Sequence, residues 1–150
     1  MRSHEGIIID LDGVVTKTAT VHFQAWKETF EELLPEFADS SGPDQFSHEE
    51  DYLSYVDGRP RYQGVKRFLE SRDVVLPFGT PADEPGHDTI CAVGNKKRRR
   101  FREMLQEEGA EVFDPAVELI RREKDRGCKV AIVSSSEDCG FVLHQVGLED

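Results

Sequence analysis

The stretch that most constrains this chain is residues 6–16, Gly-Ile-Ile-Ile-Asp-Leu-Asp-Gly-Val-Val-Thr. An apolar, β-branched run that ends abruptly in two carboxylates is typical of a buried parallel strand whose carboxyl end opens into an active site. Asp10 could attack an electrophile or bind a cation, while Asp12 could handle a proton. Gly13 would let the backbone leave the strand sharply. A divalent-ion site of another class, a calcium loop and an ordinary surface turn are the alternatives for such an Asp-x-Asp pair.

The composition indicates the class of protein. The 150 residues amount to one domain's worth of chain, and 37% hydrophobic with 33% charged residues suits a soluble globular protein. No segment approaches the roughly 20 apolar residues of a membrane span, and residues 1–5 do not begin a secretory signal, so a cytoplasmic location is the default expectation. The formal net charge of −11 argues against general nucleic-acid binding.

The three cysteines, Cys91, Cys128 and Cys139, match neither a disulfide framework nor a zinc site. We therefore expect them to be reduced, with Cys128 packed at the start of a strand. A catalytic cysteine is the alternative, although no histidine lies near any of them in the sequence.

Apolar spacing along the chain predicts several helices and a second strand. Helices are expected over residues 22–34, capped by Thr18 or Thr20, near 49–55, over 62–72 and over 95–108. Loops are expected at 38–49 and 76–87, which are rich in turn-forming residues. A helix from the cap Asp114 to Gly127, a strand at 129–133 and a helix at 137–146 follow. This order predicts an α/β sheet that is interrupted after its first strand.

Two motifs together resemble a known family. Residues 14–27 follow Asp12 with a Thr-Lys-Thr segment and a His-x-x-x-Trp pair, and residues 130–136 form an apolar strand that ends in three serines. This pattern resembles the haloacid dehalogenase-like (HAD) phosphotransferase superfamily, and specifically its β-phosphoglucomutase-like branch. The resemblance implies an α/β fold, with a HAD-like Rossmannoid parallel-sheet core at 1–17 and 112–150 and an inserted α-helical cap at 18–111.

The resemblance also implies a chemistry for the strand ends. Asp10 would take up a phosphoryl group from a small phosphorylated sugar as an aspartyl phosphate, and Asp12 would act as general acid and base. Mg²⁺ would be bound by the Asp10 carboxylate and the Asp12 backbone carbonyl. The hydroxyl of Ser134 and nearby N–H groups, including that of Ser135, are placed to hold phosphate oxygens. Alternatively, Ser136 simply caps the next helix, and both roles can coexist.

In the cap, the resemblance assigns further roles to the residues that follow the first motif. Thr18 falls at the hinge, and His22 is implied to communicate with Asp12. Trp26 is implied to line the site, with plain core packing as the alternative.

The cap also carries the cationic candidates. Arg61 aligns with the arginine that grips the distal phosphate of the substrate, although Arg59 could do that work. Lys97 matches the lysine that reaches the sugar. It lies in a basic run, residues 96–102, for which a solvated helix face, attraction of a phosphosugar and nucleic-acid binding are the alternatives.

The chain also departs from the family pattern. Lys17 stands where relatives often carry an aspartate. Family members continue, past the point that corresponds to Asp150, with a lysine that neutralises the phosphoryl group and an acidic pair that completes the Mg²⁺ site. Neither has a counterpart here, and no lysine follows Lys129. We therefore expect an amino-terminal portion of a longer enzyme, with an uncovered sheet edge that invites self-association. A sugar-phosphate phosphatase and a non-catalytic binding fragment are the alternative functions.

Overall fold

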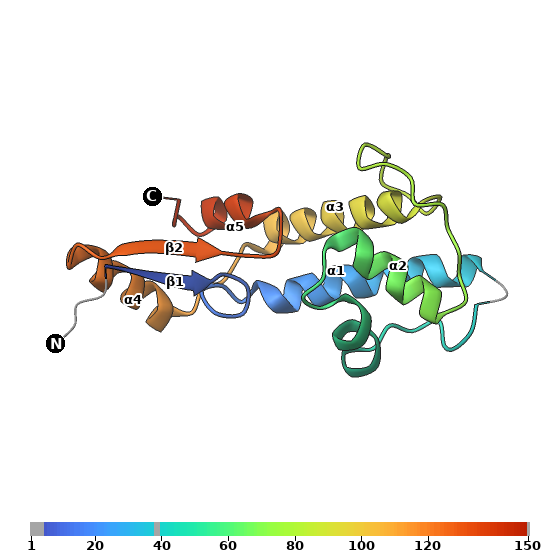
Figure 1. Ribbon diagram of the computed structural model, residues 1–150, viewed down its shortest axis with the longest axis horizontal. Helices are drawn as coiled ribbons and strands as arrows, with labels where there is room; N and C mark the ends of the chain where they lie inside the picture. The colour runs from blue at the N-terminus through green and yellow to red at the C-terminus, as the bar shows by residue number, and fades with distance from the viewer. Residues whose placement is uncertain (1–4, 38–39, 150) are drawn as a thin grey trace. The chain divides into compact units, whose positions relative to one another are not determined.

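A computed structural model describes residues 5–37 and 40–149 (Figure 1). Residues 1–4 of the amino-terminal segment, 38–39 of the expected loop, and Asp150 lie outside the described residues. The elements in chain order are β1 (Gly6–Asp10), α1 (Thr18–Leu33), a 3-10 helix (Leu34–Glu36), a π-helix (His48–Val56), α2 (Arg61–Ser71), α3 (Ile90–Glu108), α4 (Asp114–Asp125), β2 (Lys129–Val133) and α5 (Cys139–Gln145). The fold is α/β, with a parallel sheet and a helical cap, as predicted from the sequence.

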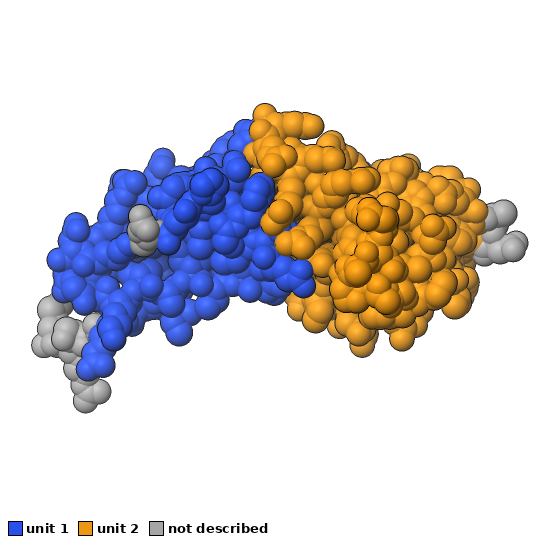
Figure 2. Space-filling view, turned by 90° about the horizontal axis from the view of Figure 1, so that it is seen from above, with its two compact units in different colours: residues 1–20, 108–150 blue, residues 21–107 orange. Residues whose placement is uncertain are grey.

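The chain forms two compact units (Figure 2). The first consists of residues 1–20 and 108–150, and the second of residues 21–107. In the described part of the chain, none of the helices is both long and apolar enough to cross a membrane.

The sheet of the first unit pairs β1 with β2 in parallel, from Gly6 opposite Lys129 to Asp10 opposite Val133. The expectation of a buried strand was wrong, because Ile8 is 76% exposed. Side chains alternate between the two faces of a strand, and only the face of Ile7 and Ile9 is half-buried. Helix α4 contacts β2. On the opposite face, Ile8 and its partner Ala131 are both exposed.

A tight turn carries the chain away from β1. The carbonyl of Leu11 accepts hydrogen bonds from the N–H groups of Val15, at 2.9 Å, and Thr16, at 3.0 Å. Gly13 has φ +81°, a conformation that favours glycine, and its N–H donates to the Thr16 carbonyl at 2.7 Å. The prediction that Gly13 lets the backbone turn sharply is therefore confirmed.

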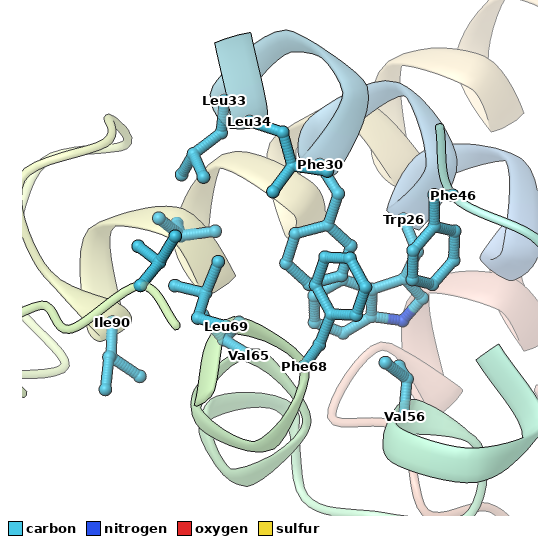
Figure 3. Close-up of a cluster of buried hydrophobic side chains, with 12 residues drawn as sticks. Trp26, Phe30, Leu33, Leu34, Phe46, Val56, Val65, Phe68, Leu69 and Ile90 are labelled. Atoms are coloured by element: carbon cyan, nitrogen blue, oxygen red, sulfur yellow. The ribbon is translucent and has the colours of Figure 1, made fainter. Parts of the chain in front are cut away.

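An aromatic core organises the second unit (Figure 3). The rings of Phe30 on α1 and Phe68 on α2 lie 4.2 Å apart between centroids, and Phe46 lies 5.0 Å from Phe30. Trp26 stacks on Phe30 with centroids 5.2 Å apart. The whole cluster comprises Trp26, Phe30, Leu33, Leu34, Phe46, Val56, Val65, Phe68, Leu69, Val74, Ile90 and Val93. This packing supports the alternative that Trp26 belongs to the core.

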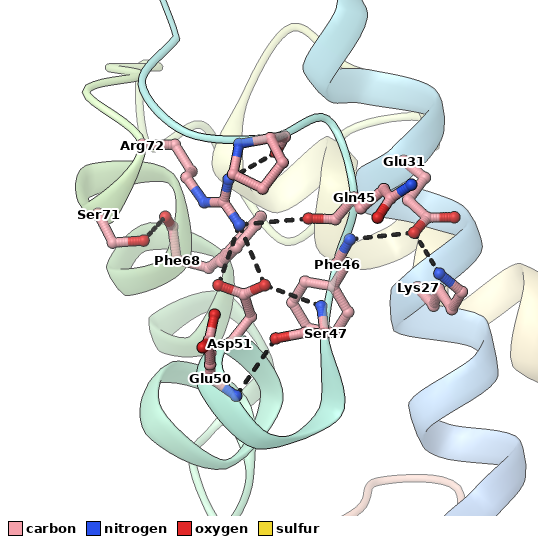
Figure 4. Close-up of polar contacts among 11 residues, drawn as sticks. Lys27, Glu31, Gln45, Phe46, Ser47, Glu50, Asp51, Phe68, Ser71 and Arg72 are labelled. Carbon is pink, nitrogen blue, oxygen red and sulfur yellow. Dashed lines mark hydrogen bonds and ion pairs between the residues drawn. The ribbon is translucent and has the colours of Figure 1, made fainter.

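A buried ion pair fastens the loop that precedes the π-helix (Figure 4). Arg72 Nη2 donates to both carboxylate oxygens of Asp51 at 3.0 Å. The same guanidinium donates to the carbonyls of Pro43, at 2.6 Å, and Gln45, at 3.2 Å. Because Asp51 lies on the π-helix and Arg72 is the C-cap of α2, one side chain ties three segments together.

Several helix boundaries differ from the sequence expectation. Helix α3 begins at Ile90, five residues before the expected start, where the Thr89 hydroxyl accepts the N–H of Ala92 at 2.9 Å. The expected cap Asp114 lies inside the first turn of α4, and Phe113 occupies the cap position. Helix α5 begins at Cys139 rather than at 137. Cys128 is only half-buried.

Candidate active site

The two aspartates of the first motif differ in their surroundings. Asp10, the last residue of β1, is exposed. Asp12, two residues further, is half-buried and accepts hydrogen bonds on both carboxylate oxygens. Thr18 Oγ1 donates to Oδ1 at 2.5 Å, and Ser134 Oγ donates to Oδ2 at 2.7 Å. The structure therefore brings Asp12 and Ser134, which are far apart in the sequence, into direct contact.

Parallel pairing explains this contact. Asp10 lies opposite Val133, so the residues after β1 and after β2 leave the same edge of the sheet. The N–H of Ser136 donates to Ser134 Oγ at 3.0 Å, which leaves the Ser134 hydroxyl hydrogen for Asp12. Ser136 Oγ in turn accepts the N–H of Asp138, just before α5 begins. Ser136 therefore bonds to the backbone ahead of α5, but Asp138 occupies the N-cap position. Phosphate binding by Ser134 stays a prediction, and Ser135 is exposed.

Thr18 has a role that the sequence did not reveal. It was predicted only as a hinge residue, but its fully buried side chain donates to Asp12. The Thr16 hydroxyl, also fully buried, lies 2.6 Å from that of Thr18 and 3.2 Å from the Leu11 carbonyl. The signal available in the sequence was the position of Thr18 at the start of α1, where a hydroxyl often bonds to a polar group outside the helix.

Cys139 at the start of α5 also lies near the carboxylates. Burial raises the pKa of its thiol above the usual value, and the negative charges of Asp12 and Asp10 raise it further. The thiolate is thus disfavoured here, which argues against the alternative of a catalytic cysteine at this position.

The implied Mg²⁺ can be tested against these donors. The described residues contain no group of three or more His, Cys, Asp or Glu side chains placed to hold a metal ion. Mg²⁺ commonly uses one or two carboxylates and completes its shell with water and substrate phosphate. The exposed Asp10 carboxylate and the backbone carbonyl of Asp12 fit that mode of binding, and an all-protein cage does not fit.

Lys97 and His22 lie together in the second unit. Lys97 is 6% exposed, and its Nζ lies 2.7 Å from Nδ1 of His22. The ammonium lies over the rings of Trp26, at 5.1 Å, and Phe101, at 4.8 Å, and the His22 ring stacks on Phe101. The structure thus gathers three predicted cap residues, Lys97, His22 and Trp26. The implied link from His22 to Asp12 joins the two units and stays a prediction.

The two candidate arginines have different partners. Arg59 Nη2 donates to the carbonyl of Ser54 at 3.3 Å, on the preceding π-helix. Arg61, at the start of α2, lies over the ring of Tyr62 and donates to its hydroxyl at 3.1 Å. The hydrogen bond from the Tyr62 hydroxyl to Asn95 Oδ1, at 2.9 Å, was not anticipated from the sequence.

Acidic partners lie beside the basic run of α3. Lys96 pairs with Glu32 at 2.5 Å, and Arg100 pairs with Glu28 at 2.6 Å. These bonds lower the pKa of Glu32 below its usual value; the pKa of Glu28 is also lowered, although burial opposes the shift. This pairing supports the alternative of an ordinary helix face for this part of the run.

Comparisons with known proteins agree with the motifs. The model of the haloacid dehalogenase-like hydrolase family matches residues 4–150. A β-phosphoglucomutase of Mycobacterium bovis is 39% identical over 144 residues, which cover 95% of this chain and 55% of that protein. The chain thus spans about half the length of this curated relative.

Solved structures show the same fold. A β-phosphoglucomutase from Clostridium difficile is 19% identical with a TM-score of 0.72, covering 99% of this chain and 59% of that one. CbbY from Rhodobacter sphaeroides, solved in complex with phosphate, is 25% identical with a TM-score of 0.57, covering 85% of this chain and 49% of that one. Since the family model matches nearly all of the sequence, the chain belongs to the haloacid dehalogenase-like hydrolase family, in its β-phosphoglucomutase-like branch.

Proposed function

We propose that this chain carries the phosphoryl-accepting part of a Mg²⁺-dependent enzyme that acts on a sugar phosphate, in the manner of a β-phosphoglucomutase. The observation that carries the proposal is the 2.7 Å bond between Ser134 and Asp12 at the sheet edge where Asp10 ends β1. The β-phosphoglucomutase of Mycobacterium bovis, 39% identical to this chain, supports the substrate class.

The proposed reaction has two halves. In the first, a carboxylate oxygen of Asp10 attacks phosphorus, the bond from phosphorus to the sugar oxygen breaks, and Asp12 gives its proton to that oxygen. In the second, a sugar hydroxyl attacks the aspartyl phosphate, the bond to Asp10 breaks, and Asp12 takes the hydroxyl proton. Bound Mg²⁺ would reduce the repulsion between the anionic phosphoryl group and the Asp10 carboxylate.

The surrounding residues have defined tasks in this proposal. Thr18 and Ser134 hold the Asp12 carboxylate in one orientation through both of its oxygens. The Ser134 hydroxyl is placed to bind a phosphate oxygen once substrate is present, with the Ser135 N–H beside it. In the cap, we assign the distal phosphate to Arg61 and the sugar to Lys97 and His22.

Trapping of the covalent intermediate tests the proposal. The chain is incubated with Mg²⁺ and β-glucose 1-phosphate that carries radioactive phosphorus, then denatured in acid and treated with hydroxylamine, which cleaves acyl phosphates. We expect labelled protein that loses its label to hydroxylamine, and no label after Asp10→Asn. Asp114→Asn, an exposed aspartate of α4, is the matched control and should label normally.

Two results would contradict the proposal: an unlabelled wild-type chain, or label that persists in Asp10→Asn. A binding fragment would instead keep its affinity for the sugar phosphate after Asp10→Asn. The products separate mutase from phosphatase, since a mutase yields the isomerised sugar phosphate, whereas a phosphatase that admits water yields free glucose.

A further inference from the structure

The side chain of Arg61 is fixed by its neighbour in the sequence. Its guanidinium carbon lies 4.8 Å from the centroid of the Tyr62 ring, and its Nη2 donates to the Tyr62 hydroxyl at 3.1 Å. A stacked, hydrogen-bonded guanidinium has lost most of its rotational freedom before any ligand arrives. Tyr62 therefore restricts the directions in which the Arg61 guanidinium can point.

The hydroxyl of Tyr62 is itself oriented by Asn95 on α3. It donates to Asn95 Oδ1 at 2.9 Å, so its oxygen is left to accept from Arg61. Asn95 has one possible amide orientation, because its Nδ2 donates to the carbonyls of Asp83, at 2.8 Å, and Pro81, at 3.1 Å. The three residues thus form a chain of hydrogen bonds with one direction: Arg61 donates to Tyr62, Tyr62 donates to Asn95, and Asn95 donates to the carbonyls of the loop.

The loop that holds Asn95 is well organised. The carboxylate of Asp83 accepts hydrogen bonds from the N–H and hydroxyl of Thr80, at 3.0 and 2.8 Å, and from the Thr89 hydroxyl at 2.7 Å. These bonds lower the pKa of Asp83 below its usual value. Asp83 thus folds the loop with its carboxylate and orients Asn95 with its carbonyl.

Gly94 permits the close approach of α2 and α3 at this point. A Cβ at position 94 would lie 2.8 Å from Cδ1 of Tyr62 and 3.1 Å from Cγ of Arg61. Any other residue would push the tyrosine and the arginine away from Asn95. The arrangement therefore depends on a glycine in the interior of a helix, where glycine is otherwise unfavourable.

We propose that Tyr62 and Asn95 are positioning residues that hold the Arg61 guanidinium in one orientation, ready to bind a phosphate group of the substrate in a bidentate manner. That the ligand is a phosphate rests on the proposed function, whereas the fixed orientation rests on the contacts above. A guanidinium held in place gives up less conformational entropy when it binds an oxyanion, so the positioning increases affinity.

The orientation can be measured without any ligand. Nitrogen-15 NMR of the arginine side chains reports rotation about the guanidinium bonds, and Arg61→Lys identifies the Arg61 signals. We expect slow rotation of the Arg61 guanidinium in the wild-type chain and markedly faster rotation in Tyr62→Phe. Tyr55→Phe is the matched control, since Tyr55 contacts Phe68 in the same unit, and it should leave the Arg61 signals unchanged.

Inorganic phosphate serves as the probe for binding, titrated while the Arg61 signals are followed. Loss of one hydrogen bond of typical strength predicts that Kd rises about five-fold in Tyr62→Phe. Asn95→Ala should raise Kd by a similar factor. The Kd of the double variant should be little higher than that of either single variant, because both residues act through the Tyr62 hydroxyl. Thermal melting confirms that each variant is folded.

The outcomes separate this inference from the proposed function. Unchanged rotation of Arg61 in Tyr62→Phe, in a folded variant, would overturn the positioning role. Fast rotation in Tyr62→Phe with no phosphate binding to the wild-type chain would support the positioning and contradict the assignment of Arg61 to phosphate. A raised Kd in Tyr62→Phe together with fast rotation of Arg61 supports both the positioning role of Tyr62 and the assignment of Arg61 to phosphate.

Discussion

Asp12 shows how much a single residue depends on partners that are distant in the sequence. Its carboxylate is held by Thr18 on one side and by Ser134 on the other. The sequence predicted that Ser134 lies near the end of the first motif, because two parallel strands that end in polar residues meet at one edge, although it did not predict the bond from Ser134 to Asp12. It did not predict the contact with Thr18, because a position at the start of a helix indicates that a hydroxyl can bond to a polar group but does not identify that group.

Ser134→Ala is expected to destabilise the chain by about 1 kcal/mol. The substitution removes a hydroxyl that donates to Asp12 and accepts from the N–H of Ser136, and this N–H then loses its partner. Urea unfolding measures the change in free energy. The neighbouring variant Ser135→Ala, at an exposed position, should cost less than half as much; equal costs would show that the Ser134 contacts contribute nothing specific.

Lys17 and Glu111 predict a pH dependence at the residue scale. Their side chains form an ion pair of 2.6 Å, and this hydrogen bond lowers the pKa of Glu111 and raises that of Lys17. The stabilisation by Glu111 is therefore present above its unfolded pKa and lost as pH falls through the lowered value. That by Lys17 is lost as pH rises through the raised value.

NMR titration of the Glu111 carboxyl checks this dependence. We expect a midpoint below 4.5 in the wild-type chain, the ordinary value for glutamate, and a return toward that value in Lys17→Gln. Because both side chains are largely exposed, salt should reduce the shift. An identical midpoint in both proteins would refute the pairing.

Among the elements, the π-helix and α2 depend on one buried ion pair. Arg72 and Asp51 are 6% and 7% exposed, so removal of either partner leaves a buried charge. Asp51→Leu and Arg72→Met are each expected to cost about 3–5 kcal/mol, and the double variant less than the sum. Urea unfolding of the four proteins completes the cycle. Glu50→Gln, at an exposed position on the same helix, is the control. If the losses in unfolding free energy of the two single variants simply add in the double variant, Asp51 and Arg72 are not coupled.

The sequence predicted the elements well where the pattern is local. The strand at 129–133 has the predicted bounds, and α3 ends at Glu108 as predicted, with Gly109 at φ +77° directly after it. It did not predict that the helix at 48–56 is a π-helix, in which Tyr52 N–H donates to the carbonyl of Ser47. In this helix the Asp51 carboxylate accepts hydrogen bonds from the Ser47 N–H and from Arg72, and contacts of this kind leave no periodic signal in the sequence.

At the scale of the whole molecule, the exposed face of the β1–β2 sheet predicts self-association. Ile8 is 76% exposed and Val133 47%, and a sheet of two strands rarely remains single in water. We expect sedimentation velocity to detect dimers as concentration rises, and Ile8→Lys to suppress them. Val75→Lys, at a loop residue that is 87% exposed, should not. A wild-type chain that stays monomeric over the same range would contradict this expectation.

The pairing of β1 with β2 also sets an order of events during translation. Residues 11–128 separate the two strands, so a ribosome must release all of them before β1 acquires its partner. The aromatic cluster between Trp26 and Val93 belongs to one continuous segment and can assemble while the strand partner is still being synthesised. Ile7 and Ile9, the half-buried residues of β1, therefore stay exposed to solvent until β2 has been synthesised.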